Sequence, residues 1–283
     1  MDAISNINIP MVWIFSILVA EYIANRKGVP TAGYVLGLFL GPLSILILLV
    51  AKSRVVNYET AEEPPENTSE ITYSSGTGFA VSDDGHIITN HHVINGAKRV
   101  YVILGGERVV CLVLGYDALN DLALLQAKSN KWPSVALFRQ ASATLIGETC
   151  TVAGFPLGGN FSSTLTVTTG IVSSVVGIGD DSNGLQVTAP IHGGNSGGPL
   201  LDSSGLVIGV VRAIANPHTF IARYGQLPQN IGFAIKAEVL KSFLSIHNVK
   251  YLESRPTPNP VSFTEIAQDA SEYVFKLECT NKK

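Results

Sequence analysis

Charged side chains and cysteines are both scarce in this sequence, and each scarcity excludes a class of protein. Only 14% of the 283 residues are charged, the formal net charge is −3, and no dense run of lysine or arginine occurs. Nucleic acid is therefore not an expected partner, because phosphate backbones are bound by clustered cations. The cysteines, Cys111, Cys150 and Cys279, are odd in number and far apart, unlike a disulfide framework or a zinc knuckle. We expect packed thiols, although one pair of cysteines is able to form a disulfide bond in an oxidising compartment.

Apolar residues are abundant, and the N-terminal part concentrates them. Residues 9–24 are apolar apart from Glu21, and residues 29–51 contain no charge. At about 1.5 Å of rise per residue the second run reaches roughly 34 Å, enough to cross a hydrocarbon core of about 30 Å. We predict a transmembrane helical hairpin, with helices at 9–24 and 29–51, inside a membrane anchor formed by residues 1–54. A cleaved signal sequence is the alternative for the first run, but no basic residue precedes it.

The residues around the second apolar run predict how the rest of the chain is placed. Arg26 and Lys27 lie in the turn of the hairpin, whereas Lys52 and Arg54 follow the second run, so the basic residues nearly balance between the two sides. Keeping Arg26 and Lys27 inside puts both ends of a multi-pass protein outside, on the periplasmic or extracellular side. Residues 55–70 include ETAEEPPENTSE, a charged stretch with paired prolines and no hydrophobic period. They are expected to form an extended linker.

From residue 71 onward the pattern changes to short alternating apolar runs broken by glycine, asparagine and aspartate. Such runs are typical of strands rather than helices, so we predict an all-β domain over residues 71–248. Antiparallel barrels or a sandwich would remove its exposed edges. A helix is expected at 236–247. Residues 249–283 are expected to form a C-terminal extension, with a short helix followed by a strand within 263–277.

The most specific motif is GGNSGGPLLD at residues 193–202, where glycines flank Ser196 on both sides. A serine nucleophile needs its hydroxyl at a sharp bend, beside backbone N–H groups that point at the substrate carbonyl. Glycines permit that bend because they lack a side chain. The alternative is a glycine-rich hairpin loop without chemistry.

Two further motifs supply the other parts of a catalytic triad. TNHHVI at 89–94 follows an expected strand, and DLALL at 121–125 begins with an aspartate before an apolar run. The chain order histidine, aspartate, serine is that of the trypsin type of triad. At this level His91 and His92 are equivalent candidates for the base, and Asp117 competes with Asp121 for the acid.

Six motifs follow one another between Ser75 and about Phe243: SGTGFAVSDDGHIITNHHVI, YDALNDLALL, VAGFPLG, TTGIVSSV, QVTAPIHGGNSGGPLLD and NIGFAI. In these motifs and in their order, the chain resembles the HtrA/Deg branch of the trypsin-like serine proteases. The resemblance implies two antiparallel β-barrels of the trypsin/chymotrypsin type. The family has a PDZ domain in many members, but too few residues follow Asn248 to form one, so none is expected.

The resemblance also assigns roles. His92, directly before Val93, is implied as the general base, Asp121 as the residue that orients it, and Ser196 as the nucleophile. The backbone N–H groups of Gly194 and Ser196 would form the oxyanion hole. Such a triad requires no metal and no organic cofactor.

Two positions near the serine bear on specificity. His192 and Gly193 stand where better-known members carry Asn-Pro, which places His192 near the expected mouth of the specificity pocket. Pro190, six residues before the nucleophile, is apolar. We therefore expect a small or medium apolar substrate residue before the scissile bond rather than lysine or arginine.

The sequence thus favours a membrane-anchored serine endopeptidase that cleaves protein or peptide substrates, in protein quality control or regulated proteolysis, with a homo-oligomer as an expected assembly. A catalytically silent peptide-binding module on the same fold is the first alternative. A small-ester hydrolase is the second, because acyl transfer to a serine does not itself specify an amide.

Overall fold

A computed structural model describes residues 71–282 except for 128–131, 133, 141–142, 157–163 and 213–229. These residues belong to the second of two compact units of the chain, Ser69–Lys283. The predicted hairpin at 9–24 and 29–51 and the linker at 55–70 lie outside the described residues. Within the described ranges, no helix has the length and apolar character needed to cross a membrane.

The first of two barrels is closed by six antiparallel strands. Their order around the barrel is β1-β14-β3-β4-β5-β2, and each pairs with its neighbours. Side chains of these strands, such as Ile87 and Leu125, are fully buried in the core. The strands are β1 Ile71–Ser82, β2 His86–Thr89, β3 Arg99–Leu104, β4 Glu107–Asp117, β5 Leu122–Ala127 and β14 Val274–Lys282.

The second barrel has the order β10-β7-β8-β9-β12-β11, and pairing of β10 with β11 closes it. Two short strands, β6 and β13, extend the sheet beyond β11 in parallel. The prediction of an all-β fold with two antiparallel barrels is therefore confirmed. The strands are β6 Leu137–Arg139, β7 Thr149–Gly154, β8 Thr166–Ser174, β9 Gly184–Val187, β10 Pro199–Leu201, β11 Val207–Arg212, β12 Gly232–Lys236 and β13 Leu252–Ser254.

The helices of the described part are short and lie outside the barrels. One turn, α4, follows β2 directly, and α6 matches the helix expected at 236–247. The last helix, α7, begins at a capping box in which Ser262 and Glu265 bond each other's backbone N–H groups. The helices are α4 His91–Ile94, the 3-10 turn η2 Ile178–Asp180, α6 Ala237–Ile246 and α7 Phe263–Tyr273.

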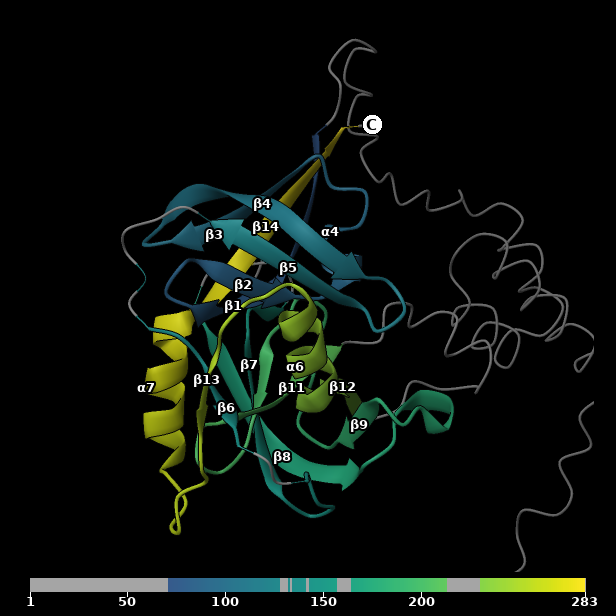
Figure 1. Ribbon diagram of the computed structural model, residues 1–283, viewed down its shortest axis with the longest axis vertical. Helices are drawn as coiled ribbons and strands as arrows, with labels where there is room; N and C mark the ends of the chain where they lie inside the picture. The colour runs from purple at the N-terminus through teal and green to yellow at the C-terminus, as the bar shows by residue number, and fades with distance from the viewer. Residues whose placement is uncertain are drawn as a thin grey trace, which may run out of the picture. The chain divides into compact units, whose positions relative to one another are not determined.

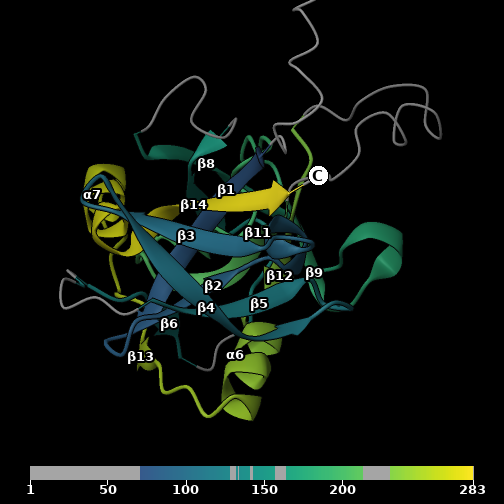
Figure 2. The same ribbon diagram turned by 90° about the horizontal axis from the view of Figure 1, so that it is seen from above.

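The end of the chain is part of the first barrel. β14 pairs with β1 from Ile71 opposite Lys282 to Phe79 opposite Val274, and its other edge pairs with β3. Figures 1 and 2 show this yellow strand lying between the blue strands β1 and β3. Residues 249–283, expected to be an extension, thus supply the strand without which the first barrel would have two open edges.

The three cysteines are free and buried, as expected for packed thiols. Cys111 and Cys279 lie on the two strands that flank β3, each opposite Val100. Burial raises the pKa of Cys111 and of Cys150 to about 12, and that of Cys279 to about 11. Because the thiolate is the reactive form, these side chains serve packing rather than chemistry.

The contribution of β14 can be measured by truncating Leu277, which is fully buried in the first barrel. We expect Leu277→Ala to lower the free energy of unfolding by about 2–5 kcal/mol in urea denaturation, because it leaves a cavity. Leu119→Ala is the matched control, since Leu119 is 90% exposed, and should change the value by less than about 0.5 kcal/mol. Equal effects of the two substitutions would show that β14 does not carry core packing.

Candidate active site

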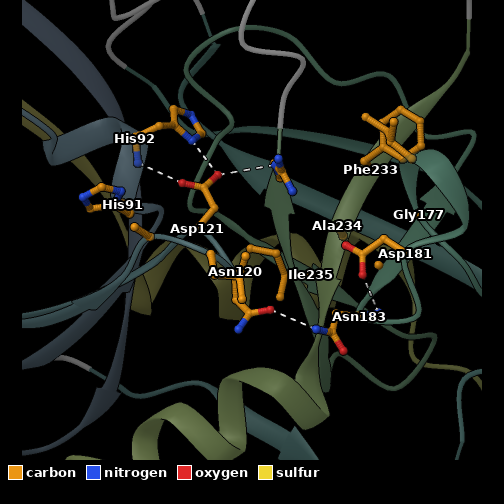
Figure 3. A pocket seen from close by; sticks show the side chains of 15 residues that line it. His91, His92, Asn120, Asp121, Gly177, Asp181, Asn183, Phe233, Ala234 and Ile235 are labelled. Carbon is orange, nitrogen blue, oxygen red and sulfur yellow. Dashed lines mark hydrogen bonds and ion pairs between the residues drawn. The ribbon is translucent and has the colours of Figure 1, made fainter.

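His92 and Asp121 form a pair that is fixed by two hydrogen bonds. The His92 ring Nδ1 lies 2.7 Å from Oδ2 of Asp121, and the backbone N–H of His92 donates to Oδ1 over 2.9 Å. His92 lies in α4 and Asp121 directly precedes β5, so the first barrel supplies both residues. Figure 3 shows the carboxylate between these two groups of His92. Bonding both oxygens to one residue fixes the orientation of the imidazole ring relative to the carboxylate.

The backbone of Asp121 is held in an unusual conformation. Its φ of 57° is left-handed, which costs about 1–3 kcal/mol for a residue other than glycine and persists only where the surroundings impose it. Two donors impose it here, because the Asp121 carbonyl accepts from the backbone N–H of His91 (3.2 Å) and from Nδ2 of Asn90 (2.9 Å). The Asn90–His91–His92 segment and Asp121 therefore position each other.

The geometry separates the two pairs of residues that motif spacing left equivalent. The ring of His91 stacks on Tyr116, with centroids 4.6 Å apart. Asp117 accepts hydrogen bonds from the backbone N–H groups of Leu119 and Asn120, and so stabilises its own turn. The structure brings together His92 and Asp121, the two residues that the family resemblance selects.

Arg212, at the end of β11 in the second barrel, also reaches this carboxylate, although the sequence motifs gave no signal for it. Its Nε lies 3.5 Å from Oδ2 of Asp121. Burial alone would raise the pKa of the Asp121 carboxyl, but the hydrogen bonds and charge of His92 and the charge of Arg212 together lower it. Asp121 is consequently a carboxylate at neutral pH.

Ser196 lies in the loop between β9 and β10 and is 4% exposed. Its carbonyl accepts a 2.9 Å hydrogen bond from the backbone N–H of Thr77 in β1. The next residue, Gly197, has a φ of 85°, and a Cβ there would come within 2.2 Å of the Thr77 carbonyl and of Oγ1 of Thr89. The glycine after the serine is therefore required by close contact with the first barrel, as well as by the turn.

The remaining predicted site residues lie in the same loop. Gly194 has a φ of 97°, a conformation that favours glycine. Its carbonyl accepts a hydrogen bond from the Thr77 hydroxyl. Pro190 and His192 are exposed, and the Pro190 carbonyl accepts from the hydroxyl of Thr168. Neither of these two lines the cavity next to His92.

A cavity of about 540 Å³ adjoins the His92–Asp121 pair, and residues of both barrels line it. Phe233 and Ile178 give it apolar walls, whereas Arg212 contributes a positive charge and the carboxylates of Asp121 and Asp181 contribute negative ones. Within the lining, Nδ2 of Asn183 donates to Oδ1 of Asn120 over 2.9 Å, as the dashed line in Figure 3 marks. The arrangement places an aligned imidazole beside a cavity that both barrels line.

The comparisons with known proteins agree with this geometry. Residues 76–210 match the family described as "Trypsin-like peptidase domain". The chain is 36% identical over 207 residues to protein y4bJ of Sinorhizobium fredii, covering 73% of this chain and 32% of that protein. It is 38% identical over 146 residues to the probable periplasmic serine endoprotease DegP-like of Chlamydia trachomatis, covering 50% of this chain and 28% of that protein.

A solved structure is similar as well. The HtrA-type protease AlgW with decapeptide superimposes with a TM-score of 0.51 at 32% identity, covering 61% of this chain and 51% of that one. The chain spans about a third of the length of the curated relatives above. The chain is thus similar to trypsin-like peptidase domains, and one of the similar structures is of the HtrA type. The membrane anchor and the expected lack of a PDZ domain stay predictions.

The electrostatic coupling of the pair predicts a measurable change in the pKa of Asp121. His92→Ala removes the ring bond and its charge while burial persists, so the pKa of the Asp121 carboxyl should rise, as followed by carboxyl-selective NMR titration. Because its pKa is lower in the folded state, Asp121 stabilises the fold at pH values above the ordinary carboxyl pKa, and this stabilisation is lost as the pH falls through the folded-state pKa. The variant should therefore lose part of that stabilisation at neutral pH.

Asp117 is the internal control for this titration. Its pKa is lowered mainly by hydrogen bonds from Asn120, which the substitution leaves in place. An Asp121 pKa that stays constant or falls in His92→Ala would contradict the coupling.

Proposed function

We propose that this chain is an HtrA-type serine endopeptidase that cleaves protein substrates through an acyl-enzyme on Ser196. The observation that carries the proposal is the His92–Asp121 pair, in which both carboxylate oxygens are bonded to the histidine. The glycine-framed loop of Ser196 and the trypsin-like family match support the same conclusion.

The ionisation of Asp121 determines which ring nitrogen can act as the base. A carboxylate only accepts hydrogen bonds, so its partner Nδ1 must carry a hydrogen. In the neutral ring Nε2 then bears a lone pair and can take the hydroxyl proton of Ser196 as its oxygen attacks the substrate carbonyl. Asp121 stabilises the imidazolium that results.

The rest of the proposed reaction follows from proton balance. The attack turns the carbonyl oxygen into an oxyanion, to which the backbone N–H groups of Gly194 and Ser196 would donate. The imidazolium of His92 returns its proton to the departing amine, which leaves an ester on Ser196. Water, activated by the same imidazole, hydrolyses this ester and restores the serine.

The setting of the enzyme is part of the proposal. The cavity beside His92 would receive an extended segment of the substrate, since its walls come from both barrels. The apolar runs at 9–24 and 29–51 support anchoring to a membrane, with the peptidase domain on the extracytoplasmic side. A role in protein quality control or regulated proteolysis fits an anchored peptidase whose substrates are other proteins.

The function is tested by comparing the wild-type chain with Ser196→Ala. The wild type should react with a fluorophosphonate probe and cleave an unfolded protein. Ser196→Ala should do neither, with a loss in turnover on the order of 10⁶ by analogy with subtilisin. Ser271→Ala, which changes an exposed serine of α7, is the matched control and should behave as wild type.

The other outcomes of this test identify the alternatives. Labelling of Ser196 without cleavage of any unfolded protein would favour a small-ester hydrolase. A folded wild type that neither labels nor cleaves, yet binds extended peptides, would favour a catalytically silent peptide-binding module.

Specificity is tested with a peptide library that varies the residue before the scissile bond. We expect small and medium apolar residues to be preferred, because the loop from Pro190 to Ser196 contains no carboxylate that could pair with a basic side chain. Mass spectrometry of the products gives the preference directly. Cleavage after lysine at an equal rate would overturn this expectation while leaving the peptidase activity itself in place.

A further inference from the structure

Thr77, in the middle of β1, makes four hydrogen bonds, and two of them go to carbonyls of the serine loop. Its backbone N–H donates to the Ser196 carbonyl over 2.9 Å, and its own carbonyl accepts from the Thr89 hydroxyl over 2.7 Å. Its hydroxyl donates to the Gly194 carbonyl over 2.7 Å and accepts from the backbone N–H of Phe155 over 2.9 Å. The residue is fully buried. One side chain of the first barrel thus bonds both the serine loop and the end of β7 in the second barrel.

The hydroxyl fixes one particular peptide group of the loop. The peptide between Gly194 and Asn195 has its carbonyl bonded to Thr77, whereas its N–H donates to the carbonyl of His192 over 3.1 Å. Both ends of this peptide plane therefore have a partner. Rotating it would break both hydrogen bonds and leave a buried hydroxyl without its acceptor, which is costly.

That peptide lies between the two proposed oxyanion donors. The N–H of Gly194 belongs to the preceding peptide, and the N–H of Ser196 belongs to the following one. Gly194 has no side chain to restrict rotation about its backbone bonds, so hydrogen bonds have to keep the two N–H groups aligned. The Asn195 N–H bond to His192 holds one side of this peptide from within the loop, and the Thr77 hydroxyl holds the other side from outside it.

We propose that Thr77 is a positioning residue that aligns the oxyanion hole through its hydroxyl. This inference rests on the proposed function. By holding the Gly194 carbonyl it keeps the N–H groups of Gly194 and Ser196 directed at one point. The Phe155 N–H occupies an acceptor site of the hydroxyl and so turns its hydrogen toward Gly194. The second barrel thereby contributes to the alignment.

A purely structural role for Thr77 makes a different prediction. Loss of a packing contact would lower stability and reduce the folded fraction, but each folded molecule would keep its turnover. A positioning role acts in the transition state, where the oxyanion forms, so kcat should fall while KM stays nearly constant. Affinity for a peptidyl boronate, whose oxygen occupies the oxyanion site, should fall with kcat.

The experiment compares three variants of the full chain on one peptide substrate. Thr77→Val keeps the shape and removes the hydroxyl, Thr77→Ser keeps the hydroxyl and removes the methyl, and Thr151→Val removes the hydroxyl of a 2% exposed threonine in β7 as a control. Losing an oxyanion donor outright costs on the order of 10²–10³ in kcat, so misalignment should cost about 10–10²-fold. Kinetic constants are normalised to the folded fraction, measured by circular dichroism.

We expect Thr77→Val to lose kcat and boronate affinity in parallel, with KM changed by less than about twofold. Thr77→Ser should recover most of the lost turnover, and Thr151→Val should match wild type. If Thr77→Val does not fold, Thr77→Ala takes its place against Thr77→Ser, and the same pattern is required.

Three results would overturn the inference. These are an unchanged kcat per folded Thr77→Val molecule, a raised KM at constant kcat, and a Thr77→Ser variant as impaired as Thr77→Val. A wild type with no Ser196-dependent activity would instead overturn the proposed function, and the positioning role with it. An active wild type with an unaffected Thr77→Val overturns the positioning role alone.

Discussion

The hydrogen bonds between His92 and Asp121 are the constraint on which the rest of the site depends. They fix the ring because one carboxylate accepts from both the backbone and the side chain of the same histidine. The left-handed backbone of Asp121, held by Asn90 and His91, is part of the same arrangement. Stored conformational cost at such a position is typical of functional sites, where surrounding contacts impose the geometry.

The two barrels contribute different parts, and strand β1 joins them. The first barrel carries the histidine and the aspartate, whereas the serine loop leads into β10 of the second. Thr77 of β1 bonds that loop on one side of the strand and pairs with Lys276 of β14 in the sheet. β14 therefore supports the strand that holds the serine loop, so the C-terminal residues contribute to the support of the site.

Sequence patterns of neighbouring residues predicted much of this structure. The features that these patterns missed depend on contacts between residues far apart in the chain. Alternating apolar runs predicted the strands, and glycine spacing singled out the Ser196 loop. Motif spacing could not separate His91 from His92, because neighbouring residues differ only in where the turn directs them. Arg212 lies outside the quoted motifs, and the motif that contains Thr77 assigned it no role, since the contact of Thr77 with Gly194 crosses 117 residues of chain.

The central claim is that Ser196 attacks while the N–H groups of Gly194 and Ser196 hold the oxyanion. A crystal structure of the protein treated with a peptidyl boronate tests it most directly. The account predicts boron bonded to Oγ of Ser196, with one boronate oxygen about 2.7–3.1 Å from both nitrogens and another facing Nε2 of His92. Boron bonded elsewhere, or an oxygen directed away from both N–H groups, would contradict it.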